Sequence, residues 1–198
     1  MTPQQQAIAV IQGEHRAMSA VIEALRHVAD EIASHDLEPD YKMLWSILYY
    51  VDQYPESHHH PNEERVLFPR IRARTHAIDA TLDELGRQHA GSRPHLDVLR
   101  NLLGRMEADI AGAREAFAAK AREYADFHLR HMGLEEREVL PKAREVLDDA
   151  DWTAIAAQFN AEPDPLRSAA VNGNAWFREF YRRLVALVPE PWGVGSRR

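Results

Sequence analysis

Hydrophobic residues recur at alternating steps of three and four along two long stretches of the chain, as they do on one face of an α-helix. The first stretch carries Ile8, Ile11, Met18, Ile22, Leu25, Ala29 and Ile32, and the later one carries Leu82, Leu85, Leu96, Leu99, Leu103, Met106 and Ile110. Another segment opens near Pro39-Asp40, which is a typical helix start, and the last begins near Arg114 and stops around Leu140 or soon after. Short links separate the segments, around residues 34–39, 74–79 and 112. The pattern predicts an all-α, up-down-up-down antiparallel four-helix bundle.

Histidines and glutamates stand on these apolar faces. His15 lies within the first stripe, and His89 takes the same place in the third segment. The second segment puts Trp45, Leu48, His59, Glu63 and Val66 on roughly one face, and the fourth puts Phe117, Ala121, Tyr124, His128, His131 and Glu135 on another. A carboxylate aimed into a core is costly unless it is paired, protonated or bound to a metal. The inward positions of Glu63 and Glu135 therefore favour a metal site.

Two stretches repeat one another at a fixed offset of 72 positions. His59, Glu63, Glu64, Arg65 and Pro69 recur in register as His131, Glu135, Glu136, Arg137 and Pro141. In each copy the histidine and the glutamate four residues later point the same way, about 6 Å apart along the helix axis. His15 and His89 extend the duplication beyond the short motif. The sequence thus predicts a pseudo-twofold internal repeat, with four inward histidines and two carboxylates at one level of the core, enough for two metals.

The composition is that of an ordinary globular protein. Of 198 residues, 45% are hydrophobic and 28% are charged, and the formal net charge is -7. Lys and Arg form no basic stripe, which argues against nucleic acid as a partner. No apolar run approaches the length of a membrane span and the N-terminus does not resemble a signal peptide, so a cytoplasmic location without a membrane partner is expected. Because the chain has no cysteine, only nitrogen and oxygen ligands are available to a metal.

Several assignments stay open at this point. His59 is preferred over His60 because its spacing to Glu63 matches the other copy, while His60 is a second candidate ligand and His58 should face outward. Pro55 and Pro61 should bend this helix. Two pairs of roles are left open: Glu64 and Glu136 are either acceptors behind the metal ligands or partners of Arg65 and Arg137, and His128 is either a proton donor behind the ligands or a polar core residue. The remaining histidines are expected in links or on the surface, at His27, His35, His76 and His95.

These motifs resemble those of the hemerythrin-like HHE cation-binding domains over roughly Ile8 to Val146. The residues that carry the resemblance are Glu14-His15, His59-His60-Pro61-Asn62-Glu63-Glu64, Leu67-Phe68-Pro69, Gln88-His89, His131-Met132-Gly133-Leu134-Glu135-Glu136 and Leu140-Pro141. The resemblance implies an up-down-up-down bundle around two non-heme iron ions with oxo and carboxylate bridges. By matching position it implies four terminal ligands, His15, His59, His89 and His131, and two bridging ligands, Glu63 and Glu135.

One position departs from the family's oxygen carriers. Those proteins have a His-x-x-x-His pair on the third helix, whereas Arg93 stands four residues after His89 here. Either His60 supplies the missing nitrogen from the second helix, or one iron keeps a more open coordination sphere. Arg93 itself either stabilises an anionic ligand or is a surface residue. Reversible oxygen carriage is thereby put in doubt, while an open position suits small reactive ligands.

Three classes of function follow. The resemblance favours a di-iron protein that binds or senses O2, NO or iron, with a small diatomic ligand or peroxide as its partner. The rival is an enzyme that degrades peroxide or reduces NO at the same centre. The third is a structural bundle with a mononuclear zinc or iron site; zinc is also the substitute metal in the first class.

The last quarter of the chain predicts a short helical extension. The bundle is assigned to residues 1–148 and the extension to residues 149–198. One helix should start at Asp151-Trp152 and run to Phe159, and another should cover residues 174–187. The aromatic residues of this region would pack it on the bundle, or alternatively form the surface of a homodimer.

Overall fold

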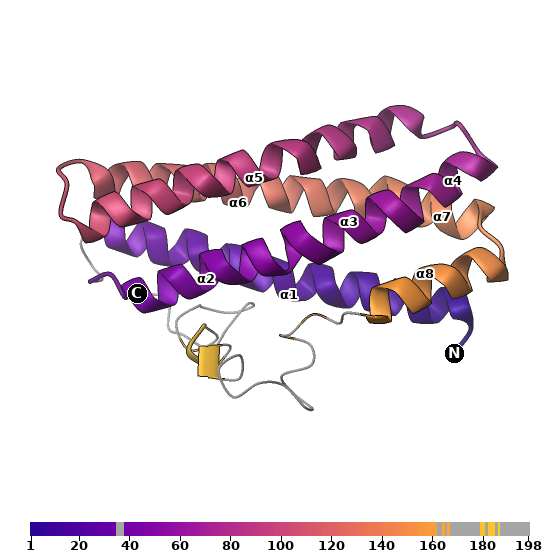
Figure 1. The fold of residues 1–198 in the computed structure, drawn as a ribbon, viewed down its shortest axis with the longest axis horizontal. Helices are drawn as coiled ribbons and strands as arrows, with labels where there is room; N and C mark the ends of the chain where they lie inside the picture. The colour runs from indigo at the N-terminus through magenta and orange to yellow at the C-terminus, as the bar shows by residue number, and fades with distance from the viewer. Residues whose placement is uncertain are drawn as a thin grey trace.

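The computed structural model describes residues 1–34 and 38–161, together with residues 164, 166, 179–180, 182–184 and 186. Every regular element in these ranges is helical, which confirms the predicted all-α class. Two of the predicted helices are unbroken: α1 (Pro3–Ala33) and α5 (Asp79–Glu107). Figure 1 shows them lying along the long axis of the molecule beside two segmented helical rods.

Each segmented rod contains π-helical turns, in which an amide donates to the carbonyl five residues back instead of four. The second rod consists of α2 (Tyr41–Gln53), η1 (Pro55–His59), α3 (His60–Asn62), η2 (Glu63–Leu67) and α4 (Phe68–Arg74). The fourth rod consists of α6 (Ala113–Leu134), η3 (Glu135–Val139) and α7 (Leu140–Val146). We call η1, η2 and η3 the wide turns. The wide turns η2 and η3 stand 72 positions apart, at the two copies of the sequence repeat.

Helix starts follow local chemistry. Thr2 caps α1 by accepting from the Gln5 amide at 3.2 Å, and Asp40 caps α2 by accepting from the Met43 amide at 3.0 Å. Gly112 precedes α6 with φ of 74°, a left-handed conformation that glycine adopts without a Cβ penalty. The predicted helix starts near Asp40 and Arg114 are therefore confirmed to within a residue or two.

Proline accounts for the position of the wide turns. Each of them ends two residues before a proline, at His59/Pro61, Leu67/Pro69 and Val139/Pro141. A proline lacks an amide hydrogen, and its ring clashes with the carbonyl four residues back, which in all three cases lies in the middle of the wide turn. Widening the turn relieves that clash. Proline alone is not sufficient, because Pro94 lies inside α5 without such a turn.

The wide turns also keep one face of the second rod pointing inward. Buried residues follow one another here at steps of four: Val51, Pro55, His59, Glu63, Leu67 and Ile71. In a regular α-helix each step of four advances about 40° around the axis, so five steps would carry the face about 200° away from the core. Each wide turn inserts one residue and takes back about 100°. Two wide turns therefore cancel the drift.

The core falls into two apolar clusters with the histidines between them. One cluster holds the second half of α1 with α2, the later part of α5 and most of α6. The other holds the start of α1, the start of α5, the far ends of both segmented rods, and α8 (Asp149–Ala161). In α1, for example, His15 stands between Ile11 of one cluster and Met18 of the other. Figure 1 shows α8 lying beside α1 near the N-terminal end.

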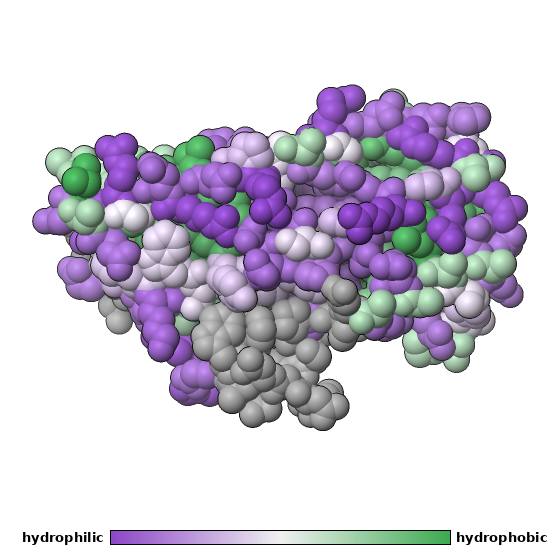
Figure 2. Space-filling view, in the orientation of Figure 1, coloured by the Kyte–Doolittle hydropathy of each residue, from purple (hydrophilic) through white to green (hydrophobic). Residues whose placement is uncertain are grey.

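Some predicted positions are wrong. Trp45 was expected on the inner face but is 37% exposed and donates to Glu107 at 3.0 Å, and Ile110 lies beyond the end of α5 and is 47% exposed. The face drawn in Figure 2 is largely hydrophilic. Among the described helices, none has the length and apolar character needed to cross a membrane. The helix predicted around 151–159 is confirmed as α8, whereas the one predicted over 174–187 lies mostly outside the described residues.

Candidate metal centre

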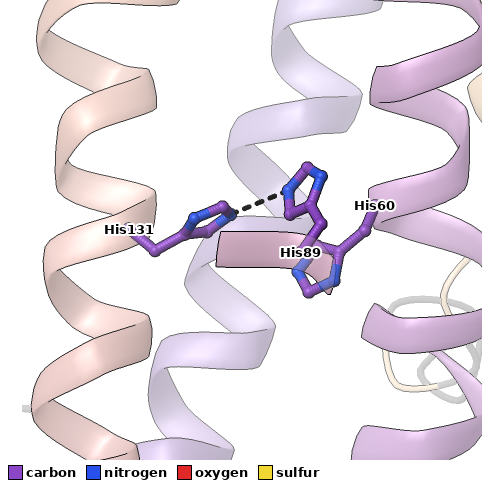
Figure 3. Close-up of side chains that lie close together, drawn as sticks. All are labelled: His60, His89 and His131. Carbon is purple, nitrogen blue, oxygen red and sulfur yellow. Dashed lines mark hydrogen bonds between the residues drawn. The ribbon is translucent and has the colours of Figure 1, made fainter. Parts of the chain in front are cut away.

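Four imidazoles meet as two pairs in the middle of the fold. The Nε2 atoms of His15 and His59 lie 3.2 Å apart, and those of His89 and His131 lie 3.1 Å apart. Figure 3 shows the second pair, with His131 on α6 facing His89 on α5. All four side chains are buried. The structure thus brings together the four histidines that the sequence singled out, one from each long helix or rod.

The outward-facing nitrogen of each of these imidazoles has its own acceptor. The Nδ1 contacts are His15 with Glu136 at 3.0 Å, His59 with Glu14 at 2.9 Å, His89 with Glu64 at 2.9 Å and His131 with Gln88 Oε1 at 2.9 Å. Each Nδ1–H donates to one of these oxygens, which orients the ring and leaves the Nε2 lone pair facing inward. Two neutral imidazoles of this tautomer have no proton between their Nε2 atoms. Each pair therefore needs a cation, either a proton or a metal ion.

The two buried carboxylates lie between the imidazole pairs. Glu63 places Oε1 3.6 Å from His59 Nε2 and Oε2 3.5 Å from His89 Nε2. Glu135 places Oε2 3.4 Å from His15 Nε2 and Oε1 3.2 Å from His131 Nε2. Each glutamate is 1% exposed, and none of the four oxygens accepts a well-aligned hydrogen bond. Each carboxylate thus directs one oxygen toward the pair His15 and His59 and the other oxygen toward the pair His89 and His131.

The electrostatics of the cluster follow from burial and from the neighbouring charges. Burial, reinforced by the Glu135 carboxylate, raises the pKa of Glu63 well above its ordinary value. Burial also acts to raise the pKa of Glu135, but the adjacent His131, His15 and His59 lower it on balance. Burial lowers the pKa of His59, and the Glu14 hydrogen bond only partly opposes it. Two carboxylates this close cannot both remain charged without a cation beside them.

His60 joins His59 in the cluster, and these consecutive residues are 5% and 1% exposed, respectively. Burial of two consecutive residues does not require a wide turn, because His131 and Met132 on the regular helix α6 are also buried, at 2% and 6%. The fourth rod has no wide turn at the position matching η1, and Met132 stands where His60 would recur. The His60 ring stacks on His89 with centroids 4.3 Å apart, and its Nδ1 has no hydrogen-bond partner (Figure 3). Burial and the surrounding histidines lower the pKa of His60 well below its ordinary value.

Arg93 does not reach the imidazoles. Its side chain is 52% exposed, and its guanidinium donates to Asp52 at 2.9 Å. The surface alternative is therefore the one that the structure supports for this residue.

The other residues left open also find definite partners. Glu64 and Glu136 accept from His89 and His15, as residues that support the cluster would. His128 is buried, lies 3.1 Å from the Ser92 hydroxyl and packs on Tyr124, and burial lowers its pKa to about 3. A neutral polar residue of the core fits that environment.

The expected surface histidines mostly behave as such. His76 is exposed beside Asp79, and His27 is half-buried. His95 is likewise half-buried, outside the imidazole cluster, and its ring packs on Phe127 at 5.4 Å. His58 contacts the Gln53 carbonyl outside the cluster, and His35 lies outside the described residues.

Sequence reasoning assigned no role to three residues that shape the site. Glu14 and Gln88 hold His59 and His131 through Nδ1. Both directly precede an inward histidine and stand 74 positions apart, which was an available signal. Phe159 of α8 packs its ring against His59 with centroids 5.9 Å apart, a contact that no local sequence pattern predicts.

The donor set fits divalent metal ions. Ligand atoms lie within 4.8 Å of one another in three groups: His15, His59, Glu63 and Glu135; Glu63, His89, His131 and Glu135; and His60, His89 and His131. Imidazole nitrogen and carboxylate oxygen suit iron, zinc and neighbouring transition metals. A bound cation would satisfy the facing lone pairs and the four unpartnered carboxylate oxygens at once.

Comparison with known proteins agrees with this geometry. No curated protein and no solved structure gave a match. The family model of the hemerythrin HHE cation-binding domain matches residues 6–143, a range that holds every residue of the cluster. The chain belongs to the hemerythrin HHE cation-binding domain family.

Proposed function

We propose that this centre holds two iron ions, one at each imidazole pair, and that the protein uses them to bind or sense O2, NO or iron. His15 and His59 would hold one ion, and His89, His131 and His60 the other. The observation that carries the proposal is the position of the buried carboxylates: Glu63 and Glu135 each direct one oxygen toward each pair. Two carboxylates that span two nitrogen sites are the arrangement that bridges a pair of metals.

The proposal includes a fold made of two equivalent halves. The halves would be antiparallel helical hairpins, arranged up-down-up-down and related by a pseudo-twofold axis. Support comes from the hydrogen bonds, because His15 pairs with Glu136 of the second half while His89 pairs with Glu64 of the first. The short connections between α1 and α2, α4 and α5, and α5 and α6 also favour this topology.

The protein's own residues would hold the centre rigid and keep most of it away from solvent. Paired irons supply one-electron redox chemistry and a coordination position for a small ligand. The Nδ1 hydrogen bonds fix the orientation of the imidazoles, and the two apolar clusters exclude water on either side of the site. Low solvent access favours retention of the metal.

Metal content per chain, with the visible spectrum before and after oxidant, tests the proposal. Protein expressed with ample iron should contain close to two irons per chain and show charge-transfer bands that respond to air or peroxide. His15→Ala and His131→Ala should each lose metal, while His76→Ala, which removes an exposed histidine, should not. Unchanged metal content in the first two variants, or a single spectroscopically silent ion, would refute the di-iron assignment. Turnover of peroxide or NO by the loaded protein would identify an enzyme instead of a binding protein.

A further inference from the structure

A solvent-open pocket reaches the centre from one side. Its volume is about 290 Å³, several times the roughly 30 Å³ that one water occupies in the liquid. The pocket lies between the second rod and α5, and its lining includes His60 and His89 of the imidazole cluster. Among the groups of the centre, His60 is the one with an unpartnered nitrogen beside this pocket: it is 5% exposed and its Nδ1 makes no hydrogen bond.

The lining offers metal-binding donors at increasing depth. Glu64 is 46% exposed, and its carboxylate already contacts His89 at 2.9 Å. Glu56 lies deeper, with a side chain that is 4% exposed and 3.8 Å from His60 Nδ1. Arg93 also lines the pocket, and its guanidinium pairs at 2.9 Å with Asp52, which pairs with Arg100 as well. Oxygen and nitrogen donors therefore lead from solvent to the cluster, as a divalent cation requires.

The His59 side of the centre is covered by α8. Phe159 is fully buried and packs on the His59 ring, and Gln158 donates to Asn62 at 3.0 Å on the second rod. His59 and Glu14 behind it are 1% and 0% exposed, respectively. A hydrated cation would have to displace this packing to approach from that side.

We propose that the pocket beside His60 and His89 is the port through which a divalent cation enters and leaves the centre, with Glu64 and Glu56 as its transient ligands. This inference rests on the proposed metal centre. The acidic, imidazole-lined wall suits a cation better than a neutral diatomic molecule, which carboxylates bind weakly, or an anion, which they repel.

Blocking the pocket tests the port directly. Ala90 lines it and is exposed, so Ala90→Trp can fill the pocket without entering the core, and Ala90→Ser leaves it open. Co²⁺ is added to the metal-free proteins, and uptake is followed by visible absorption. Ala90→Trp should slow uptake roughly tenfold or more at an unchanged final metal content, while Ala90→Ser keeps the original rate. Uptake by Ala90→Trp at the original rate would overturn the port, whereas no uptake by the unmodified protein would overturn the metal centre itself.

The internal repeat supplies a matched pair of charge variants. Glu64 and Glu136 both accept from an imidazole Nδ1, but only Glu64 is part of the pocket lining. Glu64→Gln should lower the uptake rate about threefold at low salt, with less effect at high salt, because it removes a charge along the path. Glu136→Gln, which removes a charge outside the pocket lining, should slow uptake less than Glu64→Gln does and without the same dependence on salt. Equal slowing in both variants would assign the effect to the lost imidazole hydrogen bonds and overturn the role of Glu64 in the port.

Discussion

Replacing Glu63 with methionine should stabilise the metal-free protein while destroying its metal site. The Glu63 side chain is 1% exposed and neither of its oxygens accepts a hydrogen bond, so in the absence of metal its burial opposes folding. Methionine has similar length and no polar group that needs a partner. His59 and His89 keep their Nδ1 acceptors in the variant, since those are Glu14 and Glu64.

The expected gain in stability can be estimated for a neutral buried carboxyl group and for a charged one. An unsatisfied buried polar group costs about 1–3 kcal/mol, and replacing buried ionic groups by apolar ones of similar volume gains about 1–4 kcal/mol. We therefore expect the free energy of unfolding of metal-free Glu63→Met to exceed that of the original protein by about 2 kcal/mol. Metal reverses the order, because a ligand at a thousand times its Kd stabilises the original protein by about 4 kcal/mol and the variant has lost a bridging ligand.

Urea unfolding followed by circular dichroism, with and without a chelator, measures the difference in free energy of unfolding between the variant and the original protein in both states. Glu64→Met is the control: this neighbour is half-exposed, so its removal should not stabilise the metal-free fold. If Glu63→Met proves less stable than the original protein in chelator, the carboxylate contributes to the metal-free fold, and the reasoning that it is retained for a metal is refuted.

Two further changes probe the surroundings of the centre. Phe159→Ala should lower the free energy of unfolding by about 3–5 kcal/mol in urea titrations, because it empties a fully buried ring site against His59; a loss below about 1 kcal/mol would contradict tight docking of α8. For His128, burial lowers the pKa from 6.5 to about 3, so below pH 6.5 this imidazole binds a proton in the unfolded chain but not in the folded chain. This residue alone should therefore cost the metal-free protein about 2 kcal/mol between pH 7 and pH 5, and His128→Gln should flatten that part of the stability profile.

The helices and the convergence of the inward histidines were accessible to sequence reasoning because both depend on helical phase. His15 and His89 lie in regular helices, where counting steps of three and four places a side chain correctly. The fixed offset between His59 and His131 then indicated which residues of the second and fourth rods should join them. Burial of Glu63 and Glu135 followed from the same count.

Counting steps of three and four failed to place side chains where the helix was not regular. It preferred His59 and kept the neighbouring His60 as a second candidate ligand, and the structure buries both beside the wide turn η1. It also placed Trp45 inward by extrapolating the phase of the motif at His59 back across the wide turn η1. In the second rod, buried residues follow one another at uninterrupted steps of four and lead toward prolines. This spacing was the signal that the helical phase is reset there.

Long-range contacts formed the second limit. The packing of Phe159 on His59 joins residues 100 positions apart, and no periodicity within α8 specifies its target. The positions of Glu14 and Gln88 likewise did not specify their hydrogen-bond partners, because each supports the histidine of a different helix and not the one beside it in sequence.

The difference between Glu14 and Gln88 makes the two imidazole pairs electronically unequal. His15 and His59 both donate to carboxylates, whereas His89 donates to a carboxylate and His131 only to a neutral amide. An imidazole whose N–H faces an anion is the more electron-rich donor. If two irons occupy the centre as proposed, these hydrogen bonds lower the reduction potential at the His15 and His59 position relative to the other. The residues of this chain would thus give the two metal positions different electron-donating ligands.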